Sequence, residues 1–112
     1  MNRFYLINAD YRNIKREQCM FEFTASNGTT VTVSMIAIPN SKQCAVSIYQ
    51  NKEPLIINRI PVVGEGIISK NTSESIIGGD IAFVYTSSAK GVSEFDIDRL
   101  GKDLLLYYKE EI

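Results

Sequence analysis

The segment from Pro54 to Ile68 limits the possible fold more than any other part of the chain. It is a strongly apolar run, interrupted by Pro61 and by the glycines of Gly64-Glu65-Gly66. Pro61 has a fixed φ and no backbone N–H, so it cannot lie in the central ladder of a sheet. A segment this apolar therefore needs a covering surface, which is either the chain's own core or a partner protein.

The remaining sequence is dominated by strand and turn signals. Apolar and polar residues alternate in 19–24 and again in 29–38 and 44–50, which is the pattern of half-buried strands. Asn27-Gly28 predicts the two-residue hairpin turn that would join the first two of these runs. Residues 4–7, 55–60 and 80–86 predict further strands. We therefore expect residues 1–112 to form a single all-β domain, either a small antiparallel sandwich or a partly open barrel.

The C-terminal region predicts one helical turn followed by a strand. Ser93-Glu94-Phe95-Asp96 resembles a helix capping box, but Gly101 argues against a long helix. We expect at most one short helical turn near residues 94–100 and then a strand from Asp103 to Tyr108. Neighbouring strand residues point to opposite faces, so one of the adjacent tyrosines, Tyr107 and Tyr108, should lack contact with the core.

Composition argues against several classes of function. The chain has 12 basic and 13 acidic residues without a basic stripe, which makes nucleic acid an unlikely partner. It shows no membrane anchor, and its first apolar run is too short for a signal peptide, so synthesis in the cytoplasm is expected. Histidine is missing, and Cys19 and Cys44 are far apart in sequence. We therefore expect no metal site and no cofactor.

Two short motifs could be mistaken for chemical sites. Gly64-Glu65-Gly66 lacks the flanking elements and the Gly-Lys-Ser/Thr ending of a phosphate loop, so these glycines indicate a sharp reversal or a bulge. Asp96-Ile97-Asp98 supplies too few oxygen ligands for calcium and is better interpreted as a solvated turn. No catalytic residues are predicted, and the protein is not expected to be an enzyme.

The order of these segments resembles the small baseplate plug proteins of contractile-tailed bacteriophages. Two segments carry the resemblance, Ile60–Ile68 and Asp98–Tyr108. The first is similar to an apolar-Pro-Leu-x-x-Gly-x-x-Leu-Leu segment of that family, with Ile67-Ile68 in place of the two leucines. The second is similar to its closing Leu-Gly-x-x-x-x-Leu-x-Tyr strand. This sequence also departs from the family near Cys44, where an aromatic residue often opens the strand.

The resemblance implies a structural virion protein. Plugs of this kind sit in the tail baseplate and contact hub, tube or tape-measure components, which would make this chain a plug or hub-associated adaptor. It would be synthesised in the bacterial host cytoplasm, and the resemblance leaves a homo-oligomer in the particle open. The residues themselves leave two alternatives, a small phage-encoded regulator or inhibitor of a host protein and a small ligand-binding β-barrel.

These observations assign the apolar segment to two roles. We expect Ile60 and Val62 to serve the core of the domain as part of a bent strand edge. The stretch that follows is expected to face a neighbouring protein, together with the terminal tyrosines. The predicted interface residues are Val63, Gly64, Gly66, Ile67, Ile68, Tyr107 and Tyr108.

Overall fold

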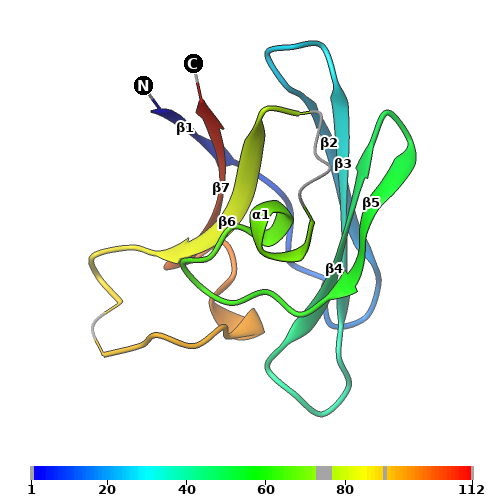
Figure 1. Cartoon of the computed structure of the whole chain (residues 1–112). Coiled ribbons are helices and arrows are strands. Elements are labelled where there is room, and N and C mark those ends of the chain that lie inside the picture. Colours follow the sequence, from blue (N-terminus) through cyan, green and yellow to red (C-terminus); the bar gives the residue numbers. More distant parts are fainter. Residues whose placement is uncertain (1, 73–76, 90, 112) are drawn as a thin grey trace.

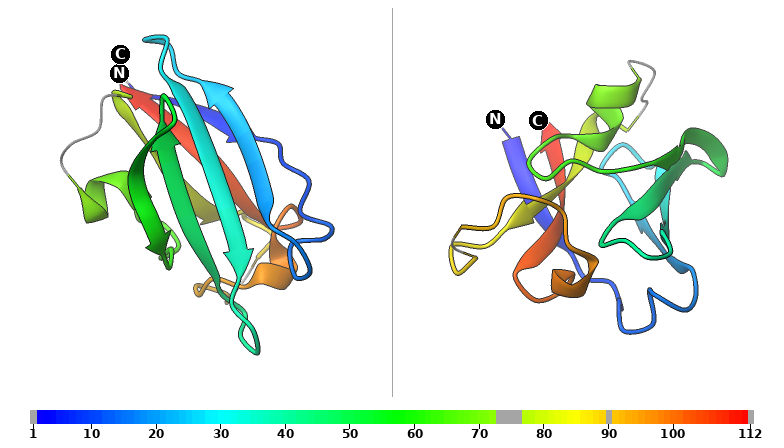
Figure 2. Two further views of the ribbon diagram at one scale, coloured as in Figure 1. Left: turned by 90° about the vertical axis from the view of Figure 1, so that its right-hand side faces the viewer. Right: turned by 90° about the horizontal axis from the view of Figure 1, so that it is seen from below.

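Two antiparallel sheets pack face to face in the computed structural model, which describes residues 2–72, 77–89 and 91–111 (Figures 1 and 2). One sheet has the strand order β1-β7-β6 and the other the order β2-β3-β4-β5. The two sheets do not close on each other, so the fold is a sandwich and not a barrel. In chain order the elements are β1 (Asn2–Ile7), β2 (Cys19–Thr24), β3 (Thr30–Ala37), β4 (Cys44–Gln50), β5 (Glu53–Arg59), α1 (Ile67–Asn71), β6 (Gly79–Tyr85), the 3-10 turn η1 (Ile97–Arg99) and β7 (Leu104–Glu111).

The core lies between the sheets and is built mainly from alternate residues of β2, β3, β4, β6 and β7, because successive side chains of a strand point to opposite faces. Strand β5 adds Ile56, and β1 adds only the half-buried Ile7. Both sheets contribute large apolar side chains that water does not reach. They include Val31, Val33, Met35, Val46, Ile48, Ile81, Phe83, Leu104 and Leu106.

The strongest alternating patterns predicted their strands correctly. The bounds of β2 and β4 are those expected from the sequence. The turn between β2 and β3 differs from the expected two-residue turn, because Ala25 N–H donates to Thr29 O over 2.8 Å and Gly28 N–H donates to Ala25 O over 2.9 Å. Gly28 has a φ of +89°. These bonds describe a longer loop, in which a turn is followed by one left-handed residue.

The expected core role of Ile60 and Val62 is wrong. Strand β5 ends at Arg59, and the chain continues without joining the ladder. Pro61 is the residue that turns inward and is buried. Its two neighbours therefore point outward, with Ile60 51% exposed and Val62 56% exposed.

Helix α1 is a second difference from the sequence-based expectation. The expected fold has at most one short helical turn, near residues 94–100, and η1 confirms that turn. Residues 67–71 form an additional short helix, although this region was expected to be a strand edge and a turn. The side chains of Ile67 and Ile68 are buried in the hydrophobic core. Helix α1 packs against β5 and β6, so it fills the side of the sandwich between these two strands.

Strand β7 is the central strand of the three-stranded sheet. It begins near the predicted position but continues three residues beyond Tyr108, as far as Glu111. Its partner β1 runs antiparallel, with Asn2 opposite Glu111, which brings the described ends of the chain side by side (Figure 1). The two tyrosines point to opposite faces as expected, with Tyr108 buried and Tyr107 half-buried.

Candidate protein-binding surface

The outer face of the β1-β7-β6 sheet carries mostly apolar side chains. Strand pairing places Leu6 beside Tyr107 and Tyr107 beside Ala82, so these three residues form a row across the sheet. Residues that lie directly opposite each other in a ladder share a face. Phe4 and Val84 lie on the same face, in the rows on either side. An apolar band therefore crosses all three strands on the side that faces away from the core.

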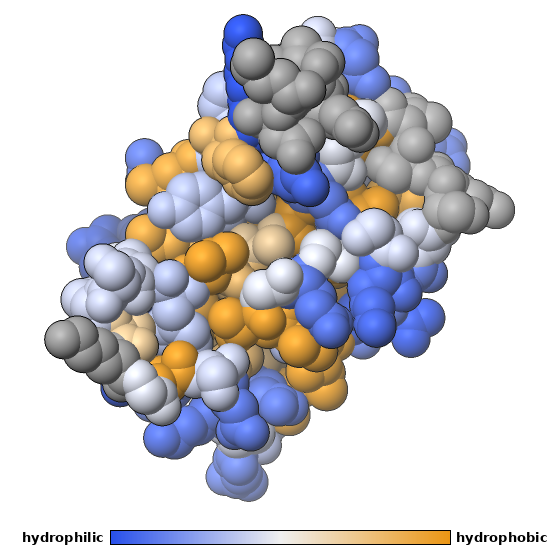
Figure 3. All heavy atoms as spheres, turned by 60° about the vertical axis from the view of Figure 1, so that its left-hand side comes forward, coloured by the Kyte–Doolittle hydropathy of each residue, from blue (hydrophilic) through white to orange (hydrophobic). Residues whose placement is uncertain are grey.

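This band is open to solvent in the isolated chain. Phe4 is 65% exposed, Leu6 47% and Val84 40%. A groove of about 530 Å³ follows the band, and Phe4, Ala82, Val84 and Tyr107 line it together with residues of the 64–69 segment. Figure 3 shows apolar side chains gathered across this side of the molecule, with hydrophilic residues around them. An exposed apolar surface with a polar margin is typical of a protein-binding site.

The 64–69 segment forms one wall of the groove, and Asp80 holds it in place. The Asp80 carboxylate accepts hydrogen bonds from the backbone N–H groups of Ile68 (2.8 Å) and Ser69 (3.0 Å), at the start of α1. A Cβ atom on Gly66 would lie only 2.1 Å from the Asp80 carboxylate. Gly64 has a φ of +84°, and its N–H donates to Phe83 O over 2.8 Å. The two glycines therefore allow the chain to dock against β6.

The sequence matches the family model of the cyanophage baseplate Pam3 plug gp18 over residues 5–111. The chain belongs to this baseplate plug family. No curated protein and no solved structure matches the chain. The family is one of structural components of the phage tail baseplate, which agrees with the resemblance found in the sequence and places the protein in the baseplate of the virion.

The predicted interface residues of this plug-family chain divide into two groups. Gly64, Gly66 and Tyr107 line the outer groove, and the half-buried Val63 packs against the hydrophobic core. The other three, Ile67, Ile68 and Tyr108, have side chains buried in the chain's own core. The sandwich itself covers the side chains of Ile67 and Ile68, whereas Tyr108, although only 3% exposed, also lines a second groove between β1 and β2. A partner contact stays a prediction for all seven residues, and burial in the core argues against it for Ile67 and Ile68.

The sequence predicted the strands that form most of the surface, but it did not assign their residues to an interface. Phe4 and Leu6 come from β1, and Ala82 and Val84 come from β6. The sequence of β6 did carry a signal for this surface, because Ala82 and Val84, which alternate with the inward-facing residues, are also apolar. A strand that is apolar on both faces needs a second covering surface, and the described residues of this plug-family chain leave Val84 40% exposed on the outer face.

The outer face of the four-stranded sheet is more polar. On this face Thr32 Oγ1 donates to the Glu22 carboxylate over 3.2 Å, and the Gln18 amide donates to the Ser34 hydroxyl. Next to them the Ser47 hydroxyl accepts a hydrogen bond from the backbone N–H of Asn58 over 3.0 Å. These groups satisfy one another within the chain. Exposed apolar side chains also occur on this sheet, namely Met20, Ile36 and, on β5, Ile57.

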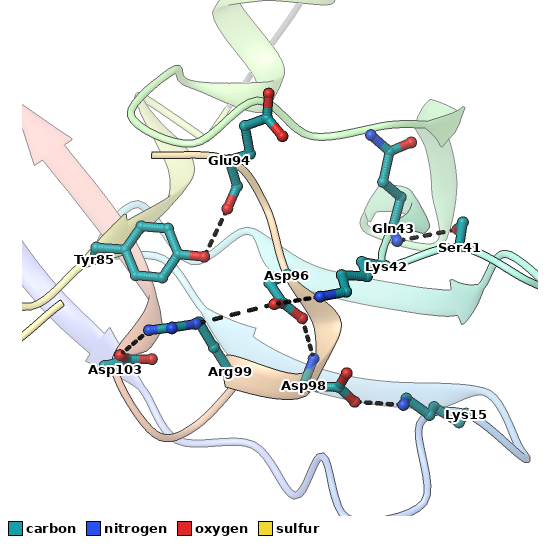
Figure 4. A network of polar contacts seen from close by, with 10 residues as sticks. All are labelled: Lys15, Ser41, Lys42, Gln43, Tyr85, Glu94, Asp96, Asp98, Arg99 and Asp103. Carbon is teal, nitrogen blue, oxygen red and sulfur yellow. Dashed lines mark hydrogen bonds and ion pairs between the residues drawn. The ribbon is translucent and has the colours of Figure 1, made fainter. Parts of the chain in front are cut away.

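A cluster of ion pairs surrounds η1 and gives the Asp96–Asp98 motif a structural role (Figure 4). The Asp96 carboxylate accepts a hydrogen bond from Asp98 N–H over 2.9 Å and lies 3.6 Å from Lys42 Nζ. Asp98 pairs with Lys15, and this contact holds the pKa of Asp98 below its usual value. Arg99 donates to Asp103 over 2.6 Å. The Asp96 side chain is only 18% exposed, so this turn is less solvated than the sequence suggested.

The described part of the chain offers neither a metal site nor a membrane-spanning helix. Residues 2–72, 77–89 and 91–111 contain no group of three or more His, Cys, Asp or Glu side chains arranged to hold a metal ion. Over the same ranges, no helix has both the length and the apolar character needed to cross a bilayer.

Proposed function

We propose that this chain is a non-enzymatic adaptor of the tail baseplate, and that it docks a neighbouring tail protein on the outer face of β1, β7 and β6. The observation that carries the proposal is the exposed apolar band of Phe4, Leu6 and Val84 on that face. Because the two sheets already bury their inner faces against each other, this band has no role in the core of the sandwich.

The chemistry of the band suits a protein partner. Burying a large apolar side chain that was exposed is worth roughly 1.5–3 kcal/mol. The band supplies several such side chains, together with the Tyr107 ring, and tyrosine is enriched in protein interfaces. Lys109 and Asp80 lie opposite each other at one end of the band, where they would form part of a polar rim. A hydrophobic centre with a polar margin is the usual anatomy of an interface.

The hub, tube and tape-measure proteins of the tail are the partners that this role requires, and several copies per particle are compatible with it. Synthesis in the host cytoplasm before assembly fits the same role. The ligand-binding barrel has less support, because the interior between the sheets is filled by side chains such as Met35, Ile48 and Phe83. Nothing in the described surface favours a host regulator over a baseplate adaptor.

The proposal can be tested with two matched aspartate substitutions. Val84→Asp places a charge in the band, and Ile36→Asp places one at a similarly exposed site (49% exposed) on the outer face of the other sheet. Each variant is expressed in competition with the unmodified protein during tail assembly, and its share of the assembled tails is measured by mass spectrometry. We expect Val84→Asp to be depleted at least tenfold and Ile36→Asp to be incorporated normally. Equal incorporation of the two variants would contradict the proposed surface.

A further inference from the structure

The two sheets of the sandwich have unequal numbers of strands, and the vacant strand position lies beside β1. The three-stranded sheet faces a four-stranded one. On the β5–β6 side, α1 fills the space between the sheets. On the opposite side β1 and β2 belong to different sheets and are not hydrogen-bonded to each other. A strand added beside β1 would give each of the two sheets four strands.

A groove occupies this position. It has a volume of about 410 Å³. One side is formed by residues 5–8, at the end of β1, and the other by residues 21–26, from β2 and the turn that follows it. Its floor is aromatic, with the ring centroids of Phe23 and Tyr108 5.0 Å apart and those of Tyr5 and Tyr108 6.2 Å apart. Tyr5 is 41% exposed, although it points to the inner side of its sheet. The groove thus exposes side chains that a neighbouring strand would cover.

The backbone of β1 has a sheet partner on only one side within the described residues. Its neighbour is β7, and the ladder ends at β1. An edge strand presents unpaired N–H and C=O groups, which form a template for another strand. The edge is also apolar on both faces of the sheet, because Phe4 and Leu6 point outward while Tyr5 points inward. An added strand would therefore gain backbone hydrogen bonds and apolar contacts at the same time.

The charge of the groove indicates which strand would fit. Its lining contains two carboxylates, Glu22 and Glu110, and no lysine or arginine. Glu110 is already satisfied by Ser26 and by the Tyr108 hydroxyl, and Arg3 lies opposite it in the ladder. Glu22 lies at the rim of the groove, on the outer face of β2, where it is exposed and, among the described contacts, accepts a hydrogen bond only from the Thr32 hydroxyl. A basic residue in the incoming strand would therefore find a counter-ion at Glu22.

We propose that the groove between β1 and β2 receives an extended strand from another polypeptide, which pairs with the free edge of β1. The strand has apolar side chains at the alternate positions that face the aromatic floor and a basic residue near Glu22. About five residues, or roughly 17 Å of extended chain, would fill the groove. This site adjoins the outer face proposed for docking, because Leu6 belongs to both, but the inference does not depend on the baseplate role.

Three synthetic peptides test the pairing on the purified, isotope-labelled protein. The first alternates valine and threonine over seven residues with a lysine at each end. The second has the same core with N-methylated backbone nitrogens, and the third replaces both lysines with glutamate. We expect the first peptide to shift and protect the amide signals of β1 in NMR and hydrogen-exchange measurements. The methylated peptide should not bind, because it cannot donate to the edge, and the glutamate peptide should bind about threefold more weakly.

A pair of substitutions locates the binding. Tyr5→Lys should weaken the lysine peptide about tenfold, because it places a positive charge against the peptide's lysines and removes an aromatic contact. Ile57→Lys is the control, since Ile57 is 47% exposed on β5, an edge strand of the other sheet. It should leave the affinity unchanged. The proposal is overturned if β1 does not respond to the lysine peptide, if the methylated peptide binds equally well, or if the edge is occupied only by self-association of the protein.

Discussion

The two sides of the sandwich, one between β5 and β6 and the other between β1 and β2, differ in how the core is covered. Between β5 and β6 the chain covers its own core, because Ile67 and Ile68 of α1 are buried there. Between β1 and β2 there is no such cover, and Tyr5 and Tyr108 form part of an open groove. The difference shows that an apolar segment in the sequence does not by itself mark an interface. In this molecule the most apolar segment is divided, because Ile67 and Ile68 close the core while Ile60 and Val62 are exposed. The exposed apolar band of the outer face comes instead from β1 and β6, on either side of β7.

The largest effect is expected at the closed side. Ile67→Asp would bury a carboxylate in the core, and we expect the free energy of unfolding to fall by at least about 4 kcal/mol. Ile60→Asp is the matched control, because Ile60 lies in the same apolar segment but is half-exposed. It should change stability by less than about 0.5 kcal/mol. Urea unfolding followed by circular dichroism measures both. Similar losses in the two variants would mean that the segment does not divide in this way.

The second-largest loss of stability is expected where α1 contacts β6. Gly66→Ala places a Cβ atom against the Asp80 carboxylate, and we expect a loss of about 2 kcal/mol. Asp80→Ala removes that obstacle and also the two hydrogen bonds that hold the start of α1. The Gly66→Ala change should therefore cost much less in the Asp80→Ala background. Additive losses in the double variant would show that the carboxylate does not require glycine at position 66.

A smaller loss of stability is expected on the side between β1 and β2. The Tyr108 hydroxyl donates to Ile77 O over 3.1 Å and contacts the Glu110 carboxylate over 3.1 Å. Tyr108→Phe should lower stability by about 1 kcal/mol, since it leaves buried acceptors without this donor. Tyr107→Phe changes the neighbouring ring on the outer face and should have almost no effect. Equal effects of the two changes in thermal unfolding would contradict the assignment of Tyr108 to the interior.

The smallest effect concerns acid stability at the same side. Hydrogen bonds from the Ser26 hydroxyl and N–H hold the pKa of Glu110 below its usual 4.5. A carboxyl with a depressed pKa in the folded state stabilises the protein above the unfolded-state pKa, and this contribution is lost as the pH falls through the folded-state pKa. Unfolding measured from neutral pH to below 4.5 should show a steeper loss for the unmodified protein than for Glu110→Gln. Parallel curves would show that Glu110 does not contribute to the loss of stability in acid.

The strands of the sandwich could be predicted from the sequence because each carries its own signal. In β2 and β4 the alternation of apolar and polar residues is local and needs no knowledge of the partner strand. Helix α1 could not be found in this way. Its five residues are too few to show a helical period. The carboxylate that satisfies its first N–H groups comes from Asp80, which lies on a strand further along the chain.

The candidate surface was predicted only in part, for a related reason. Gly64, Gly66 and Tyr107 belong to segments that the sequence singled out, and they line the outer groove. Phe4 and Val84 complete the surface only because β7 brings β1 and β6 together. Their common face depends on strand order and register, which a single sequence does not specify for distant strands.

Site-specific photocrosslinking in assembled tails would show whether the outer face of β1, β7 and β6 meets another baseplate protein. One variant carries a photoreactive residue at position 84, and a second variant carries it at position 36. Both sites are exposed, but they lie on opposite outer faces of the sandwich. We predict an intermolecular crosslink to a baseplate protein from position 84 and none from position 36. A crosslink from position 36 alone would contradict the assignment of the partner-binding surface to β1, β7 and β6.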